Sequence, residues 1–341
     1  MRPSSEVDMI EGLPETSGAD AVADLEATAA LIADVRAEIS KVIFGQTTVI
    51  DLALTTLLAG GHALLVGVPG IAKTRLVETL GAVLGLDEKR VQFTPDLMPS
   101  DILGSEVLEQ DETGARAFRF IKGPVFSQLL MADEINRASP RTQSALLQSM
   151  QEKQVSIAGK RHDLPRPFHV LATQNPLEQE GTYPLPEAQL DRFLMQIDVE
   201  YPDEAAEREM LISTTGPVEG RVRTILSPEK LIHAQAVVRQ IPSGTQVVDA
   251  ILDVVRSARP TEEADDDVKR HVAWGPGPRA SQALLLAARA RALLEGRLAP
   301  SVDDVIALAP PILRHRMALT FTARADGLTL DGVIGDLLRK L

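Results

Sequence analysis

The stretch ALLVGVPGIAKT, residues 63–74, decides the fold of this chain. Its first four residues predict a short buried strand. The rest follows the phosphate-loop pattern G-x-x-x-x-G-K-[ST], with Ala72 where the pattern has its second glycine. In such a loop the glycines let backbone N–H groups point at phosphate oxygens, helped by the positive end of the following helix. An ordinary glycine-rich turn is the alternative that this motif alone leaves open.

The whole loop is expected to bind the phosphates of a nucleotide. Lys73 would reach the β- and γ-phosphates, and Thr74 would be a ligand of Mg²⁺. The residues predicted to contact the nucleotide here are Gly67, Val68, Pro69, Gly70, Ile71, Ala72, Lys73 and Thr74.

Two later segments place polar side chains where buried strands end. The apolar run at 129–132 ends in Asp133 and Glu134, and a third strand ends just before Asn175. Asp133 would hold Mg²⁺, directly or through water, and Glu134 would polarise the attacking water as general base. Asn175 could touch the γ-phosphate or that water. The competing interpretation is two charges at a strand end that reaches solvent, and a polar turn before Pro176.

Length and composition favour a two-domain intracellular protein. The 341 residues exceed one typical domain of about 100–200 residues. Hydrophobic residues make up 44%, enough for a sizeable core. The absence of cysteine excludes disulfides and thiolate metal sites, and the acidic N-terminus lacks the apolar segment of a signal peptide. No membrane span is expected, and the expected location is cytoplasmic.

Charge and aromatic content argue against nucleic acid as a partner. The net charge is -13, no run of lysine and arginine is present, and aromatic residues make up only 3%. A large phosphate-backbone footprint needs clustered basic residues, and single-strand binding needs stacking platforms.

Strand-like and helix-like segments alternate in the first 200 residues, which predicts an α/β domain with a parallel sheet. After Val199 the pattern is almost entirely helical, with Ser227 and Ser301 as helix caps. We therefore predict a flexible acidic tail at 1–23, an αβα core at 24–201 and a helical domain at 202–341. The expected helices are 24–43 and 47–58, and the expected strands are 63–68, 91–93, 128–131, 169–172 and 194–199.

Taken together, the motifs resemble the MoxR family of AAA+ ATPases. They are GVPGIAKT, LLMADEINRASPRTQSALLQSMQE, ATQNP, YPLPEAQLDRFL and WGPGPRA, which run in this order from Gly67 to Ala280. The resemblance implies a P-loop NTPase core with a five-stranded parallel sheet, two β-hairpin insertions and an all-α lid. It also implies that ATP binds between core, lid and the neighbouring subunit of a homo-oligomeric ring, commonly a hexamer.

The resemblance also assigns roles to single residues. Lys73 and Thr74 match the Walker A motif, Asp133 and Glu134 match Walker B, and Asn175 matches sensor 1. Arg192 matches the arginine finger that acts on the next subunit, where such a cation accelerates phosphoryl transfer. Arg279 matches sensor 2, expected to act within its own subunit. In isolation, either arginine would be taken for a surface or ion-paired residue.

Other parts of the resemblance concern the adenine and the ring. Adenine is expected against Phe44, Gly45 and Gln46, where helix-end packing is the alternative. Arg137 and Arg141 are candidates for the subunit interface. One insertion is predicted as strands 106–110 and 116–121, the other as strands 154–157 and 162–164. The turn of the second would carry Lys160 and Arg161 toward the pore.

The function implied is Mg²⁺-dependent ATP hydrolysis coupled to chaperone-like remodelling of proteins. A von Willebrand factor A domain protein is the partner that families of this kind often have. Three alternatives remain open: a nucleic-acid motor, a magnesium-chelatase-like motor subunit, and a nucleotide-binding scaffold without turnover. Glu134 and Arg192 argue against the last.

Overall fold

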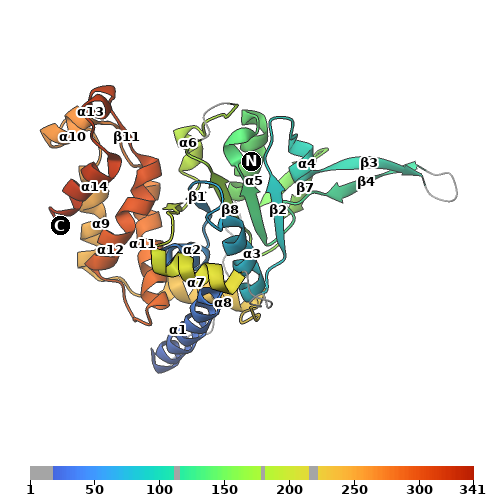
Figure 1. Cartoon of the computed structure of the whole chain (residues 1–341), viewed down its shortest axis with the longest axis horizontal. Coiled ribbons are helices and arrows are strands. Elements are labelled where there is room, and N and C mark those ends of the chain that lie inside the picture. Colours follow the sequence, from blue (N-terminus) through green and yellow to red (C-terminus); the bar gives the residue numbers. More distant parts are fainter. Residues whose placement is uncertain (1–17, 111–115, 178–180, 215–221) are drawn as a thin grey trace, which may run out of the picture.

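The N-terminal half of the chain is a parallel sheet covered by helices on both faces (Figure 1). The computed structural model describes residues 18–110, 116–177, 181–214 and 222–341. All neighbouring strands of the sheet are parallel. The order across it is β2 (Glu88–Gln92), β5 (Leu129–Asp133), β8 (His169–Gln174), β1 (Ala63–Val66) and β9 (Met195–Asp198). The predicted five-stranded core is confirmed.

The first helix of this half begins earlier in the chain than predicted. The first starts at Gly18 instead of 24, so 18–23 of the predicted tail are helical, while 1–17 lie outside the described residues. The second, at 47–58, has the predicted bounds. The helical elements are α1 (Gly18–Ser40), α2 (Thr47–Leu58), α3 (Lys73–Leu84), α4 (Pro99–Leu103), η1 (Ile135–Arg137), α5 (Pro140–Glu152) and α6 (Glu187–Leu190).

The C-terminal part is helical, as predicted, with one small sheet added. β10 (Val272–Trp274) and β11 (Ala318–Leu319) pair antiparallel, and strands this short leave no alternating pattern in the sequence. The hydroxyls of Ser227 and Ser301 cap helices as expected. The helical elements are α7 (Glu204–Thr214), α8 (Pro228–Gln240), α9 (Thr245–Ser257), α10 (Asp266–His271), α11 (Pro278–Leu294), α12 (Val302–Leu313), η2 (Arg314–Arg316), α13 (Phe321–Ala325) and α14 (Leu330–Leu338).

Both predicted hairpins are present. The first, β3 (Gly104–Gln110) and β4 (Arg116–Lys122), projects far from the body (Figure 1). The second is β6 (Gln154–Ile157) and β7 (Lys160–Asp163). Its turn is shorter than predicted. Ala158 and Gly159 both have positive φ and form the two-residue turn that matches strand twist, so Lys160 and Arg161 belong to β7.

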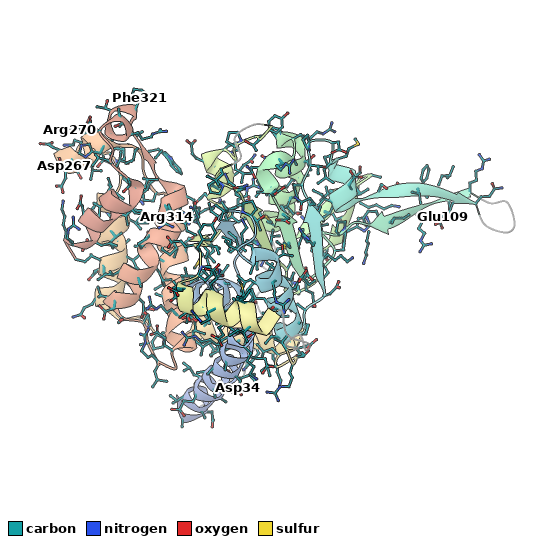
Figure 2. All side chains as sticks on the ribbon, in the orientation of Figure 1. Asp34, Glu109, Asp267, Arg270, Arg314 and Phe321 are labelled. Atoms are coloured by element: carbon teal, nitrogen blue, oxygen red, sulfur yellow. The ribbon has the colours of Figure 1, made fainter. Side chains whose placement is uncertain are left out.

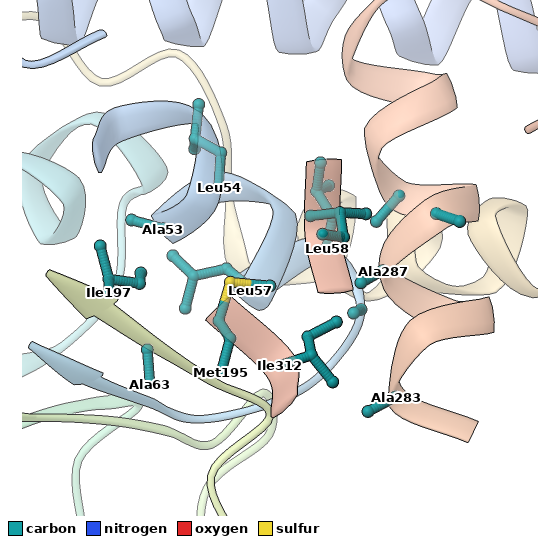
Figure 3. Close-up of a cluster of buried hydrophobic side chains, with 14 of the residues drawn as sticks. Ala53, Leu54, Leu57, Leu58, Ala63, Met195, Ile197, Ala283, Ala287 and Ile312 are labelled. Atoms are coloured by element: carbon teal, nitrogen blue, oxygen red, sulfur yellow. The ribbon is translucent and has the colours of Figure 1, made fainter. Parts of the chain in front are cut away.

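One apolar core joins the sheet to the helical part. Leu54, Leu57 and Leu58 of α2 are fully buried. Figure 3 shows this helix between strands β1 and β9 on one side and helices α11 and α12 on the other. The helical part is therefore packed against the β9 edge of the sheet. No helix in the described ranges is long and apolar enough to cross a membrane.

Two buried histidines lie at the amino-terminal end of the central strands. His169 Nδ1 is 2.8 Å from the Gly61 carbonyl oxygen, and its Nε2 is 3.0 Å from Gln235 Nε2. A neutral ring satisfies both contacts, donating from Nδ1 and accepting at Nε2. Burial lowers the pKa of His169 to about 4 and that of His62 to about 3.

These histidines predict acid destabilisation. Their folded pKa values lie below the unfolded value near 6.5, so their contribution is complete above pH 6.5 and is lost as pH falls toward 4 and 3. Each accounts for up to about 1.4 kcal/mol of unfolding free energy per pH unit in that window. His169→Gln should flatten the pH dependence of urea unfolding between pH 6.5 and 4. His233→Gln, at an exposed position, is the control, and equal slopes for all three proteins would contradict the assignment.

Candidate active site

The loop after β1 has two positions at which its backbone requires glycine. A Cβ at Gly67 would come within 2.6 Å of the Val199 carbonyl oxygen. Gly70 has φ +84° and nothing near its Cβ position, so it needs glycine for its conformation. Ala72 has φ 63° and ψ 21°, a left-handed conformation that costs alanine about 1–2 kcal/mol. The alanine that departs from the phosphate-loop pattern is therefore strained.

Lys73 is the first residue of α3, directly beneath this loop. Its half-buried ammonium donates to the carbonyl oxygen of Gly67 and, at 3.3 Å, to that of Val68. A helix also presents, at its amino-terminal end, backbone N–H groups that have no acceptor within the helix. Loop, lysine and helix end thus form a cradle for anionic oxygens.

The parallel sheet brings the other predicted residues to the carboxyl-terminal ends of the strands, where the phosphate loop also lies. Gly67 follows β1, Asn175 follows β8, and Asp133 ends β5, which are three adjacent strands. The Gly67 N–H donates to the Gln174 carbonyl oxygen at 3.2 Å, which fixes the loop against β8. Asn175 is 4% exposed, and its Oδ1 accepts from the Leu177 N–H.

Asp133 is held by two residues that the sequence did not indicate. Its Oδ1 accepts from the Thr173 hydroxyl at 2.5 Å, and its Oδ2 accepts from Arg90 Nε at 3.1 Å and Nη2 at 2.5 Å. Arg90 lies on β2 and Thr173 on β8, so these contacts cross the sheet.

A magnesium ion fits this place. Asp133 and the Thr74 hydroxyl are oxygen donors of the kind that Mg²⁺ prefers. Among the described residues no group of three or more histidines, aspartates or glutamates is placed so that it could hold a metal ion. The remaining ligands would be water and phosphate oxygens, as is usual for this ion.

Glu134 is pinned in a strained conformation. Its φ is 54°, and its N–H donates to the Thr173 hydroxyl oxygen at 2.9 Å. Its carboxylate Oε2 accepts from Gln92 Nε2 at 2.6 Å and from Arg137 Nη1 at 2.8 Å. Such strain is typical of functional positions. Arg137, predicted at a subunit interface, thus contacts Glu134 of its own chain, whereas Arg141 is exposed on α5.

The predicted adenine segment borders a cavity of about 650 Å³ between sheet and helical part. Gly45 and Gln46 line it on one side, and Leu308 and Arg314 on the other. Gln46 donates to the Ile71 carbonyl oxygen at 3.3 Å, and its buried Oε1 has no hydrogen-bond partner among the described residues. That free acceptor fits an amino group such as the one on adenine. Phe44 is half-buried.

Arg192 and Arg279 lie at the opposite side of the sheet, where the amino-terminal ends of the strands are. Arg192 precedes β9, which pairs in parallel with β1 from Ala63 to Val66. The length of β1, about 13 Å for four residues, therefore separates it from the loop. Arg279 lies beside it, in the same cavity of about 260 Å³, with Nη1 3.4 Å from Asp191 Oδ2. The lid packs beside β9 and places Arg279 near the amino-terminal ends of the strands, away from the phosphate loop. The expectation that Arg279 acts within its own subunit does not fit this position.

Comparison with known proteins agrees with this geometry. Residues 62–195 match the ATPase family associated with various cellular activities (AAA), and residues 264–336 match the AAA lid domain. Chaperone MoxR1 of Mycobacterium tuberculosis is 45% identical over 305 residues, covering 89% of this chain and 80% of that protein. Protein MoxR of Paracoccus denitrificans is 32% identical, with 84% and 88% covered.

The chain belongs to the MoxR family of AAA+ ATPases. A solved structure from Cytophaga hutchinsonii, assigned as an ATPase, has a TM-score of 0.88 and 38% sequence identity. The matched region covers 95% of this chain and 98% of the Cytophaga hutchinsonii chain. The MoxR fold, an AAA core with an AAA lid, is thereby established for the chain, and residues 264–336 of the helical C-terminal part match the lid.

Lys73→Ala should abolish measurable nucleotide binding, because the charge that faces the β- and γ-phosphates is lost. Calorimetric titration with ATP and with ADP would measure this. Lys89→Ala removes the same charge from an exposed position on β2 and should bind like the unmodified protein. Equal affinity of a folded Lys73→Ala variant would contradict the phosphate-loop assignment.

Proposed function

We propose that this protein hydrolyses ATP with Mg²⁺ at a site shared by two subunits of a homo-oligomeric ring. The observation that carries the proposal is the division of charged residues between the two edges of the sheet. Lys73, Asp133 and Glu134 lie at the carboxyl-terminal ends of the strands, whereas Arg192 and Arg279 lie at the amino-terminal ends. A single chain cannot bring both sets to one phosphate.

Each residue of the first set has a distinct role. Lys73 and the N–H groups of the loop bind the phosphates, and Thr74 and Asp133 hold Mg²⁺. Glu134 accepts the proton of the attacking water, and Asn175 orients that water or the γ-phosphate. Mg²⁺ neutralises charge on the phosphate oxygens. Gln46 and the cavity beside it take the base.

The second set serves the neighbouring subunit. Arg192 has no hydrogen-bond or ion-pair partner for its guanidinium within the described part of the chain, so this cation is available to a phosphate of another chain. Arg279 lies beside it and is half-exposed. We propose that both act in trans, where fixed cations stabilise the developing charge of the transferred phosphoryl group.

The work done with this energy is proposed to be remodelling of protein partners. The name of the mycobacterial relative, Chaperone MoxR1, supports this class. The hairpin projects from the body where Figure 2 labels Glu109, and it offers an apolar surface, since Phe118 is 68% exposed and Leu108, opposite it, 52%. A von Willebrand factor A domain protein is one proposed partner. The net charge of -13 disfavours a nucleic-acid motor, and stimulation of the ATPase by DNA at physiological salt would reverse this choice.

Two variants, each inactive alone, test the proposal together. Glu134→Gln should bind ATP without hydrolysing it, because an amide is no general base. Arg192→Ala should also bind ATP, with turnover reduced by about 10³-fold or more. In mixed rings some interfaces combine an intact Glu134 with an intact Arg192, so phosphate release should partly return.

Subunit exchange is checked by size-exclusion chromatography of differently labelled variants. Arg256→Ala, which removes an exposed arginine on α9, serves as the control. Full activity of Arg192→Ala alone, or exchange without any recovery of activity, would contradict a site shared in this way.

A further inference from the structure

Arg316 is a buried arginine that the proposed site does not yet use. It lies in η2, at the end of lid helix α12, and its side chain is only 2% exposed. Burying a guanidinium is costly unless its charge and its N–H groups are all paired. The partners of this residue therefore indicate what it is there to hold.

All five N–H donors of Arg316 have acceptors, and four of them go to the loop that carries Arg192. Nε donates to Asp191 Oδ1 at 2.8 Å, and Nη2 donates to the carbonyl oxygens of Phe193 at 2.7 Å and Asp191 at 3.3 Å. Nη1 donates to the Leu194 carbonyl oxygen at 3.0 Å and to that of Ile312 at 2.6 Å. The backbone is thus bound on both sides of Arg192.

We call the bonds from Arg316 to residues 191–194 the Arg316 clamp. Few charged groups surround it. The adjacent His315 is buried, which lowers its pKa well below the ordinary value, so it is neutral. Its Nε2 is 3.1 Å from the Phe193 carbonyl oxygen and 2.7 Å from Arg316 Nη1. Asp191 is the carboxylate that faces Arg316, and its second oxygen lies 3.4 Å from Arg279. One aspartate therefore contacts both Arg316 and Arg279, and it directly precedes Arg192 in the chain.

The same lid segment also reaches the cavity proposed for the base. Leu308, Pro311 and Arg314 line that cavity, and Arg314, which Figure 2 labels in the lid, forms an ion pair with Asp198. Asp198 ends β9, whereas Asp191 to Leu194 precede it. Arg314 and Arg316, two residues apart, thus hold opposite ends of one strand. A nucleotide in the cavity of a subunit would contact the segment that clamps that subunit's own Arg192.

We propose that Arg316 is a positioning residue that fixes the loop of Arg192 and links the lid of one subunit to hydrolysis in the next. This rests on the proposed trans role of Arg192. Lysine at this position keeps the charge but has only three donors in another geometry, so it cannot hold three carbonyls and Asp191 together. A displacement of about 1 Å at a catalytic cation can lower turnover about 10²-fold.

Arg316→Lys should therefore lower kcat about 10²-fold while ATP affinity stays unchanged. Arg297→Lys is the matched control, because Arg297 makes a similar set of bonds to Asp304 and Glu295 but entirely within the lid. It should leave turnover unchanged. Melting temperatures of both variants show how much of any effect is loss of stability.

Complementation distinguishes positioning of Arg192 from a structural role. Mixed with Glu134→Gln, Arg316→Lys should regain activity, because its intact Glu134 receives Arg192 from the partner variant. Mixed with Arg192→Ala it should not, because both lack a working finger. The reverse pattern, or normal turnover of Arg316→Lys alone, would overturn the inference.

A second variant covers the case in which Arg316→Lys does not fold. Asp191→Asn is nearly isosteric and weakens the bonds to Arg316 and Arg279, and it should give the same complementation pattern. If Arg192→Ala and Glu134→Gln fail to complement each other, the proposed function itself fails. If they succeed and both Arg316→Lys and Asp191→Asn behave like Arg297→Lys, only the positioning role is wrong.

Discussion

The common direction of the five strands is the constraint on which the proposed chemistry depends. Parallel strands place all their carboxyl ends at one edge and all their amino ends at the other. The phosphate loop, Asp133 and Asn175 follow strand ends, so they converge without further arrangement. Arg192 precedes a strand, and the same rule puts it on the far side. A site that needs both must be built from two chains.

Side chains from neighbouring strands fix the positions of Asp133 and Glu134. The Thr173 hydroxyl donates to Asp133 and accepts from the Glu134 N–H, so one group sets the position of both acidic residues. Arg90 and Gln92, on the edge strand, hold the two carboxylates from the other side. These contacts hold the carboxylates in place without any ligand, which would limit the reorganisation needed for the proposed catalysis.

Much of this could be predicted because the motif residues lie next to one another in the chain. The loop 67–74, the pair Asp133–Glu134 and the five strands follow from local patterns, and the structure confirms the strands. Thr173, Arg90 and Gln92 could not be identified, because their roles depend on which strands are neighbours. Likewise the position of Arg279 depends on where the lid packs, and the sequence of α11 carries no record of that. Lys160 and Arg161 are predicted in the turn of the second hairpin but belong to β7, because the sequence does not distinguish a two-residue turn from a four-residue one.

The central claim is that no single subunit contains a complete site, and the dependence of activity on protein concentration tests it most directly. ATPase activity per chain should be measured over a dilution series while light scattering reports the molar mass with ATP and Mg²⁺ present. The account predicts that activity per chain falls on dilution in step with dissociation of the oligomer. Constant activity per chain, down to concentrations at which only monomer is detected, would contradict it.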